Sequence, residues 1–176
     1  MKKIQIIVGS TRDNRKALKI AKWIKMKSES IDSIDFDITD LKDWNLPNYN
    51  EPGSPMMSKS YKHELTTKWS EHIGSSDGFI FVTPEYNGFF TGALKDAIDY
   101  LYHEWAFKPY GIVGYGSRGA KRAVKQLHLL LSSFKMKNIS EDIGIVEVWD
   151  AFNGDGLDEG KVDGVINDLL KSFIMK

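Results

Sequence analysis

The sequence predicts an α/β fold in which a doubly wound, parallel sheet of five strands is covered by helices on both faces. Two observations lead to this prediction. Five short runs rich in Ile, Val and Phe alternate along the chain with five stretches whose apolar residues recur at helical spacing. Several of these runs are apolar at consecutive positions, which is typical of strands that are buried on both faces between two layers of helices.

The first half of the chain carries two of the strands and two of the helices. The strand at 3–9 is dense in Ile and Val, which favour extended backbone, and the helix at 14–28 has a face of Ala and Ile residues. The strand at 34–41 alternates in part between apolar and polar residues. The loop at 42–60 contains three prolines and is long for a compact domain, which is typical of functional or mobile segments. The second helix is marked by Tyr61, Leu65, Trp69 and Ile73.

The second half of the chain carries the remaining elements. In chain order they are a strand at 77–83, a helix at 91–102, a strand at 110–115, a helix at 121–136 and a strand at 143–148. A loop rich in Gly and Asp follows at 153–160. The last helix is marked by one apolar face, which consists of Val162, Val165, Ile166, Leu169, Leu170 and Phe173.

The composition is that of a single globular domain that comprises residues 1–176. Hydrophobic residues make up 41% of the chain and charged residues 27%, as in ordinary soluble domains. The 24 Lys and Arg residues balance the 24 Asp and Glu residues, and this lack of a cationic excess argues against nucleic-acid binding. A formal net charge of +0 also favours self-association.

Missing and scattered residue types restrict the chemistry further. The chain has no cysteine, which excludes disulfides, thiolate nucleophiles and Cys-ligated metals. The four histidines lack metal-ligand spacing, so we expect surface or packing roles for them and no metal site. The first apolar run is about five residues long, below the roughly 7–15 of a secretory signal. No stretch approaches the ~20 apolar residues of a membrane span, so we expect a cytoplasmic protein without a membrane partner.

Polar and cationic residues follow the first predicted strand, at the edge where ligands of such sheets bind. Gly9 allows a tight turn, and the hydroxyl groups of Ser10 and Thr11, with the free amides of the helix start, suit phosphate oxygens. Arg12 and Arg15 add guanidinium groups that can make bidentate contacts. The Gly-Lys-Ser/Thr ending of a Walker loop is missing. A helix cap with solvated arginines explains the segment equally well at this stage.

The turn after the third strand reads Pro84-Glu85-Tyr86-Asn87. A proline fixes its own backbone angle and restricts the residue before it, so the amides that follow can face a flat heterocycle. The Asn87 carboxamide offers both a donor and an acceptor. The alternative is a capped turn with the phenylalanines at 89–90 in the core or at a subunit contact. We favour a binding site for 84–87 and packing for the phenylalanines.

A glycine-rich turn at 114–119 follows the fourth strand and matches the pattern G-x-G-x-x-G. This dinucleotide fingerprint normally opens a Rossmann domain, whereas fewer than 60 residues follow the turn here. We therefore expect the glycines to permit close approach of the backbone to a ligand ring. A nucleophile elbow at Ser117 is excluded because it requires glycine where Tyr115 stands, and a hydrolase triad is missing because the only later histidine is His128.

Taken together, these segments resemble the NADPH-dependent FMN reductase family of quinone, azo and chromate reductases, over about residues 4–148. The resemblance is carried by Gly9-Ser10-Thr11-Arg12 with Arg15, by Pro84-Glu85-Tyr86-Asn87, by residues 92–99 and by the turn at 114–119. It implies a flavodoxin-like three-layer fold with strand order 2-1-3-4-5, FMN at the carboxyl edge of the sheet, and pairing into homodimers or homotetramers.

The resemblance also assigns roles to site residues. Ser10, Arg12 and Arg15 match positions that cradle the FMN phosphate; Pro84, Glu85, Tyr86 and Asn87 match the segment along the isoalloxazine; Tyr115, Gly116 and Ser117 match the turn at its pyrimidine side. No catalytic side chain is implied. The chain departs from the family at Thr91-Gly92, where Pro-Gly is common, and near Ser117, where a further glycine is frequent.

The implied function is transfer of two electrons from NADPH or NADH, through bound FMN, to a small acceptor such as a quinone, an azo compound or free flavin. One alternative is a flavodoxin-type electron carrier without its own turnover, although such carriers are often strongly acidic and this chain is neutral. A second alternative is a flavin-free regulatory protein on the same fold.

Overall fold

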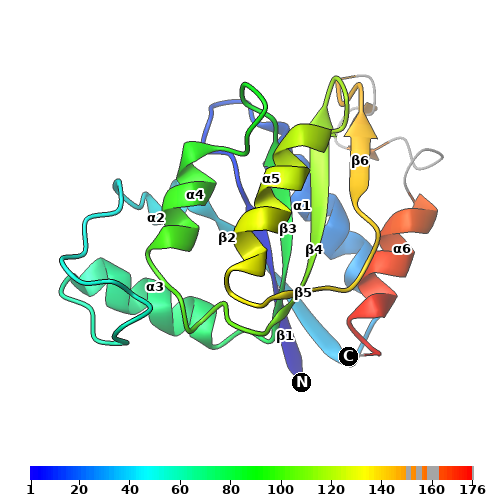
Figure 1. Cartoon of the computed structure of the whole chain (residues 1–176). Coiled ribbons are helices and arrows are strands. Elements are labelled where there is room, and N and C mark those ends of the chain that lie inside the picture. The colour runs from blue at the N-terminus through cyan, green and yellow to red at the C-terminus, as the bar shows by residue number, and fades with distance from the viewer. Residues whose placement is uncertain (150–151, 154–155, 158–162, 176) are drawn as a thin grey trace.

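The computed structural model describes residues 1–149, 152–153, 156–157 and 163–175. These residues form a parallel sheet in which the strands lie in the order β2-β1-β3-β4, with β5 and β6 both paired to the outer side of β4 (Figure 1). The strands are β1 (Lys2–Val8), β2 (Ile34–Asp40), β3 (Gly78–Pro84), β4 (Pro109–Gly116), β5 (Lys137–Asn138) and β6 (Ile143–Val146). The predicted fold class and the strand order 2-1-3-4-5 are confirmed.

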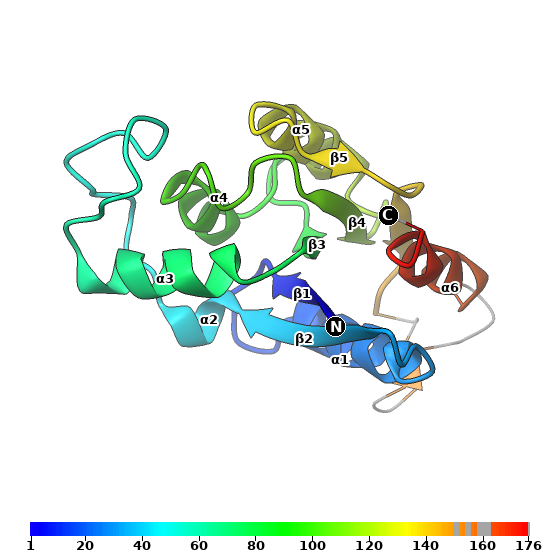
Figure 2. The same ribbon diagram turned by 90° about the horizontal axis from the view of Figure 1, so that it is seen from below.

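Helices cover both faces of the sheet, with α1 and α6 on one face and α3, α4 and α5 on the other (Figure 2). Their bounds are α1 (Lys16–Ser28), α3 (Glu64–Gly74), α4 (Gly92–Asp99), α5 (Lys121–Ser132) and α6 (Asp163–Ser172). Neighbouring residues of a strand point to opposite faces. Val8 and Val82 are therefore buried beneath the first pair of helices, whereas Ile7 and Phe81 are buried beneath the other three. Two apolar cores explain why the strands are apolar at consecutive positions.

The outer strand differs from the prediction of one strand at 143–148. It is divided into β6, which pairs with the second half of β4, and the short β5, which pairs with the start of β4. The two residues of β5 are polar and exposed, so no apolar run marks this strand in the sequence. A hydrogen-bonded chain holds the intervening segment against α5. The Tyr110 hydroxyl lies 2.7 Å from Nδ1 of His128, whose Nε2 lies 2.8 Å from Oδ1 of Asp142.

Other boundaries also shift for local reasons. The predicted helix at 121–136 ends at Ser132, although Phe134 and Met136 continue the buried apolar pattern in the turn that follows. Lys135 in that turn has a left-handed backbone (φ 54°). A short helix, α2 (Leu41–Trp44), begins one residue before the predicted loop at 42–60 and includes the first residues of that loop. Of the predicted loop at 153–160, the structure describes two paired segments, β7 (Phe152–Asn153) and β8 (Gly156–Leu157), and the remainder lies outside the described residues.

The long loop is held against the helices beside it. The Tyr49 amide donates to Asp96 of α4 at 3.1 Å, and the Tyr100 hydroxyl donates to the Asn48 carbonyl at 3.2 Å. Glu51 accepts hydrogen bonds from the amides of residues 62 and 63, just before α3 begins. These hydrogen bonds tie the loop to the segment that leads into α3. Among the described residues, none of the helices has the length and apolar character that crossing a membrane requires.

We predict that Tyr110 makes the fold sensitive to high pH. Burial raises the pKa of Tyr110 from 10.0 to about 12. From about pH 10 to about pH 12 the unfolded chain therefore loses this proton more readily than the folded chain, and the stabilising contribution of the protonated phenol is lost as the pH rises. Urea unfolding across this range should show a smaller decline in the free energy of unfolding for Tyr110→Phe than for the parent. Equal declines would contradict the assignment.

Candidate functional site

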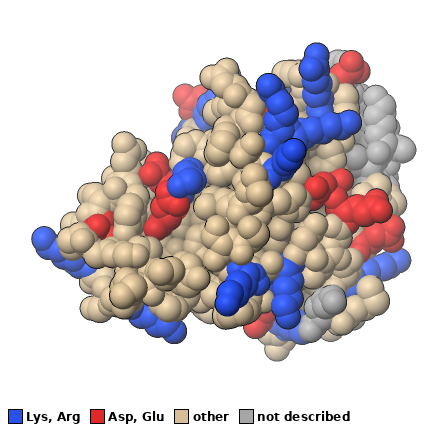
Figure 3. Space-filling model, in the orientation of Figure 1, with Lys and Arg blue, Asp and Glu red and all other residues tan. Residues whose placement is uncertain are grey.

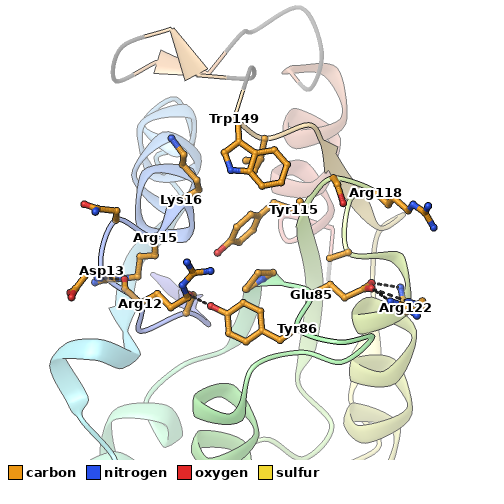
Figure 4. A pocket seen from close by; sticks show the side chains of 17 residues that line it. Arg12, Asp13, Arg15, Lys16, Glu85, Tyr86, Tyr115, Arg118, Arg122 and Trp149 are labelled. Atoms are coloured by element: carbon orange, nitrogen blue, oxygen red, sulfur yellow. Dashed lines mark hydrogen bonds and ion pairs between the residues drawn. The ribbon is translucent and has the colours of Figure 1, made fainter.

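A cavity of about 630 Å³ opens at the carboxyl edge of the sheet, where the loops after β1, β3, β4 and β6 meet (Figure 4). This volume lies within the range of roughly 300–1,000 Å³ that is usual for cofactor sites. Nine of the ten predicted site residues line it: Ser10, Arg12, Arg15, Pro84, Glu85, Tyr86, Tyr115, Gly116 and Ser117. The tenth, Asn87, is not among the described residues that line it. The structure thus brings together three turns that are far apart in the sequence.

Asn87 has a structural part in the turn beside the cavity. Asn87 and Gly88 both have positive φ angles, 52° and 88°, and the amide of Tyr86 donates to the carbonyl of Phe89 at 2.8 Å. A two-residue turn of this kind is a type I′ turn, for which Asn-Gly is a preferred sequence. The turn holds Tyr86 at the cavity wall. The predicted packing role holds for Phe90, which is buried, whereas Phe89 is 46% exposed in the single chain.

One end of the cavity is suited to an anion. Ser10 is buried at the end of β1, and Arg12 follows with its guanidinium carbon 6.0 Å from the centre of the Tyr86 ring. The Ser10 and Tyr86 hydroxyl groups lie 3.2 Å apart, which links the first turn to the second. Helix α1 begins at Lys16, and its N-cap residue Arg15 makes no side-chain capping hydrogen bond. Amides at the start of a helix are suited to a phosphate group, and in this structure the Tyr115 phenol makes hydrogen bonds with Ser10 and with the Ala17 backbone at this position.

Arg15 forms an ion pair within the protein. Its guanidinium group forms an ion pair with Asp40 at the end of β2, and both side chains are about nine-tenths buried. Asp40 also accepts a hydrogen bond of 3.0 Å from the Lys42 amide and so caps α2. The Nε atom of Arg15 is buried and has no hydrogen-bond partner among the described residues. Arg15 therefore anchors the first turn to β2.

Glu85 holds the second turn to the third. Its carboxylate accepts hydrogen bonds from the Arg122 amide at 3.0 Å and from the Arg122 Nε at 2.9 Å, and it forms an ion pair with the same guanidinium group. Burial alone would raise the pKa of Glu85, but the hydrogen bonds from Arg122 and Ala123 lower the pKa below its ordinary value. At neutral pH Glu85 is therefore a carboxylate that caps α5 from a neighbouring loop.

The three glycines of the third turn have different functions. Gly116 lines the cavity with φ 146°, and a Cβ atom added there would meet no atom within 4 Å, so a ligand has room beside this backbone. Gly119 has φ 65°, and an added Cβ atom would lie 2.9 Å from Gly144 of β6. At Gly114 an added Cβ atom would lie 2.6 Å from the Gly119 carbonyl oxygen. The predicted close approach to a ligand fits Gly116, whereas Gly114 and Gly119 permit packing within the protein.

Tyr115 forms a wall of the cavity and is only 6% exposed. Burial raises the pKa of Tyr115 to about 12, so its phenol is protonated at neutral pH. Sequence reasoning missed Trp149, which lines the cavity from the loop after β6, and Lys16 at the start of α1. The rule that ligands lie beyond the carboxyl ends of strands would have identified Trp149, because it comes directly after the predicted fifth strand.

Cationic side chains surround the cavity. Arg12, Arg15 and Lys16 lie toward α1, and Arg118 and Arg122 lie at the side of α5 (Figure 4). In the space-filling view, Lys and Arg side chains gather over the start of α5, where Arg118, Lys121 and Arg122 are exposed (Figure 3). The neutral chain therefore carries a local positive potential at this edge. A phosphorylated, planar ring fits the donors, the aromatic walls and the open backbone at Gly116.

A doubly wound parallel sheet with such a cavity at its carboxyl edge is the arrangement of a flavodoxin-like flavoprotein. The chain belongs to the NADPH-dependent FMN reductase family, whose model matches residues 2–150. This finding confirms the resemblance of the sequence motifs to that family.

Individual relatives agree with the family assignment. The chain is 41% identical over 136 residues to an NAD(P)H-dependent FMN reductase of Schizosaccharomyces pombe, covering 77% of this chain and 68% of the relative. It is 36% identical over 147 residues to an NAD(P)H-dependent FMN reductase of Saccharomyces cerevisiae, covering 78% and 77%. The fold resembles that of the flavoenzyme NAD(P)H:(acceptor) oxidoreductase of Paracoccus denitrificans, with a TM-score of 0.79, 24% identity and coverage of 99% and 96%.

We predict that Glu85→Ala lowers the free energy of unfolding by about 1–2 kcal/mol, because the start of α5 loses its capping acceptor and Arg122 loses its partner. Glu85→Gln keeps an acceptor for the α5 amides and should cost less. Urea unfolding of the parent and both variants measures the difference. An unchanged stability of Glu85→Ala would show that Glu85 does not hold these loops together.

Proposed function

We propose that the chain is an FMN-dependent NAD(P)H oxidoreductase that passes two electrons from NADPH or NADH to a small acceptor such as a quinone, an azo compound or free flavin. The observation that carries the proposal is the convergence of the turns after β1, β3 and β4 on one cavity, one end of which is cationic and lies at the start of α1. Membership of the NADPH-dependent FMN reductase family supports it.

Different residues along the cavity would contact different parts of FMN. Ser10 and Arg12, with the start of α1, would bind the phosphate, and Arg15 would hold this loop to β2 through Asp40. Pro84 and Tyr86 would lie along the flavin ring, and the turn at Asn87 and the carboxylate of Glu85 would fix the position of this segment. Tyr115, Gly116 and Ser117 would border the pyrimidine side.

The residues of this cavity would hold FMN, which would supply the redox chemistry between the nicotinamide and the acceptor. The protein would bind the cofactor and orient it toward the nicotinamide and the acceptor. The three cavity groups with shifted pKa values do not titrate near neutral pH, because the pKa values of Asp13 and Glu85 are lowered and that of Tyr115 is raised to about 12. This fits a site in which no side chain must act as an acid or a base. Backbone amides near the pyrimidine would stabilise negative charge on the reduced ring.

The proposal extends to assembly and compartment. We propose one flavodoxin-like domain over residues 1–176, acting in the cytoplasm as a homodimer or homotetramer that binds neither nucleic acid nor membrane. The neutral net charge and the exposure of Phe89 and of Met57, which is 80% exposed, support self-association.

The activity is tested by NADPH and NADH oxidation with a panel of quinones and azo compounds, with and without added FMN. We expect turnover that depends on FMN. Stopped-flow mixing of the FMN-loaded protein with NADPH separates the enzyme from an electron carrier, since a carrier would not be reduced directly. Absence of FMN binding by the parent protein would favour a flavin-free regulatory role and contradict the proposal.

We predict that Arg12→Ala weakens FMN binding by about 1.5–3 kcal/mol, which corresponds to roughly 10- to 150-fold in Kd, because one charge-assisted contact to the phosphate is lost. Isothermal titration of the apoprotein with FMN measures the effect. Lys68→Ala is the matched control, since Lys68 is an exposed cation on α3 that does not line the described cavity. An unchanged affinity of Arg12→Ala would refute its phosphate role.

A further inference from the structure

Trp149 is an exposed aromatic side chain at the mouth of the cavity. It is 62% exposed, whereas Trp23, Trp69 and Trp105 are each exposed by 4% or less. Tryptophan has a large apolar surface that is costly to leave in water, and exposed aromatic groups beside a cavity are typical of binding sites. Trp149 is among the residues that line the cavity. Its surface is therefore placed where a bound ligand would cover it.

The backbone after β6 is built to bring Trp149 to this position. Glu147 has a left-handed backbone (φ 49°), which is uncommon for a residue other than glycine and costs conformational energy. The next residue, Val148, is 2% exposed and packs into the core beneath α1 and α6. The bend at Glu147 and the anchor at Val148 fix the direction of the chain just before Trp149.

Trp149 completes a set of aromatic groups from separate parts of the chain, the end of β4 and the loops after β3 and β6. Its indole lies on the side of the cavity opposite Tyr86, and Tyr115 lies between them (Figure 4). The cations Arg12, Arg15 and Lys16 lie together toward α1 (Figure 4). A ligand whose phosphate is bound near α1 would extend its planar part among these aromatic side chains.

We propose that Trp149 packs against the ring of bound FMN and closes the side of the site that the loops after β1, β3 and β4 leave open. The inference rests on the proposed function, and it assigns a fourth loop to the cofactor site. Trp149 is a binding residue in this account, and its effect is on FMN retention rather than on the electron transfer itself.

The test is isothermal titration of the apoprotein with FMN for the parent, Trp149→Ala and Trp149→Phe. By analogy with other stacked rings, we expect Trp149→Ala to raise the Kd for FMN roughly 5- to 100-fold and Trp149→Phe to retain most of the affinity. Phe107→Ala is the matched control because Phe107, 61% exposed, precedes β4 at the opposite edge of the sheet, and it should leave the Kd unchanged. Tryptophan emission provides a second readout, since FMN should quench it more strongly in the parent than in Trp149→Phe.

The outcomes separate this inference from the proposed function. If the parent binds FMN and Trp149→Ala binds it equally well, the inference is wrong and the proposed function stands. If Trp149→Ala weakens binding of NADP⁺ to the apoprotein while FMN affinity is unchanged, Trp149 contacts the nicotinamide dinucleotide instead, and the inference is again overturned. If the parent does not bind FMN, the proposed function fails and the inference fails with it.

Discussion

The site depends on one constraint, which is the parallel alignment of strands that are buried on both faces. Because β1, β3, β4 and β6 run in the same direction, their carboxyl ends meet at one edge, and the loops that follow them share one cavity. Two apolar cores, one under α1 and α6 and one under α3 to α5, hold the strands in place, so their carboxyl ends stay together at this edge. Binding chemistry from distant parts of the chain is thus assembled by the packing of the sheet.

Some polar side chains at this edge hold the loops of the cavity together, and others line the cavity. Asp40 binds Arg15, Glu85 binds the start of α5, and the Asn87 turn positions Tyr86. The first two of these contacts satisfy charges that would be costly to bury alone. The Ser10 hydroxyl, the Arg12 guanidinium and the start of α1 lie together at one end of the cavity, so a chain with no net charge still has a cationic pocket.

The sequence predicted the features that follow directly from periodicity and strand order. Apolar runs identified β1, β3 and β4, and the carboxyl-edge rule placed their turns together. Features that depend on tertiary contacts were missed. The polar β5 has no apolar signal, and the commitment of Glu85 to Arg122 requires knowledge of which loops are neighbours. Asn87-Gly88 carried a recognisable turn signal, but the carboxamide itself was interpreted as a ligand contact. Trp149 was overlooked because only the turns after the first, third and fourth predicted strands were considered.

The central claim is that this cavity binds a flavin with its phosphate at the Arg12 end. Parallel titrations of the apoprotein with FMN and with riboflavin, which has the same ring but no phosphate, test it most directly. The account predicts one FMN per chain and a substantially weaker interaction with riboflavin, because Ser10, Arg12 and the start of α1 would lose their anionic partner. Equal affinities for the two flavins would contradict it.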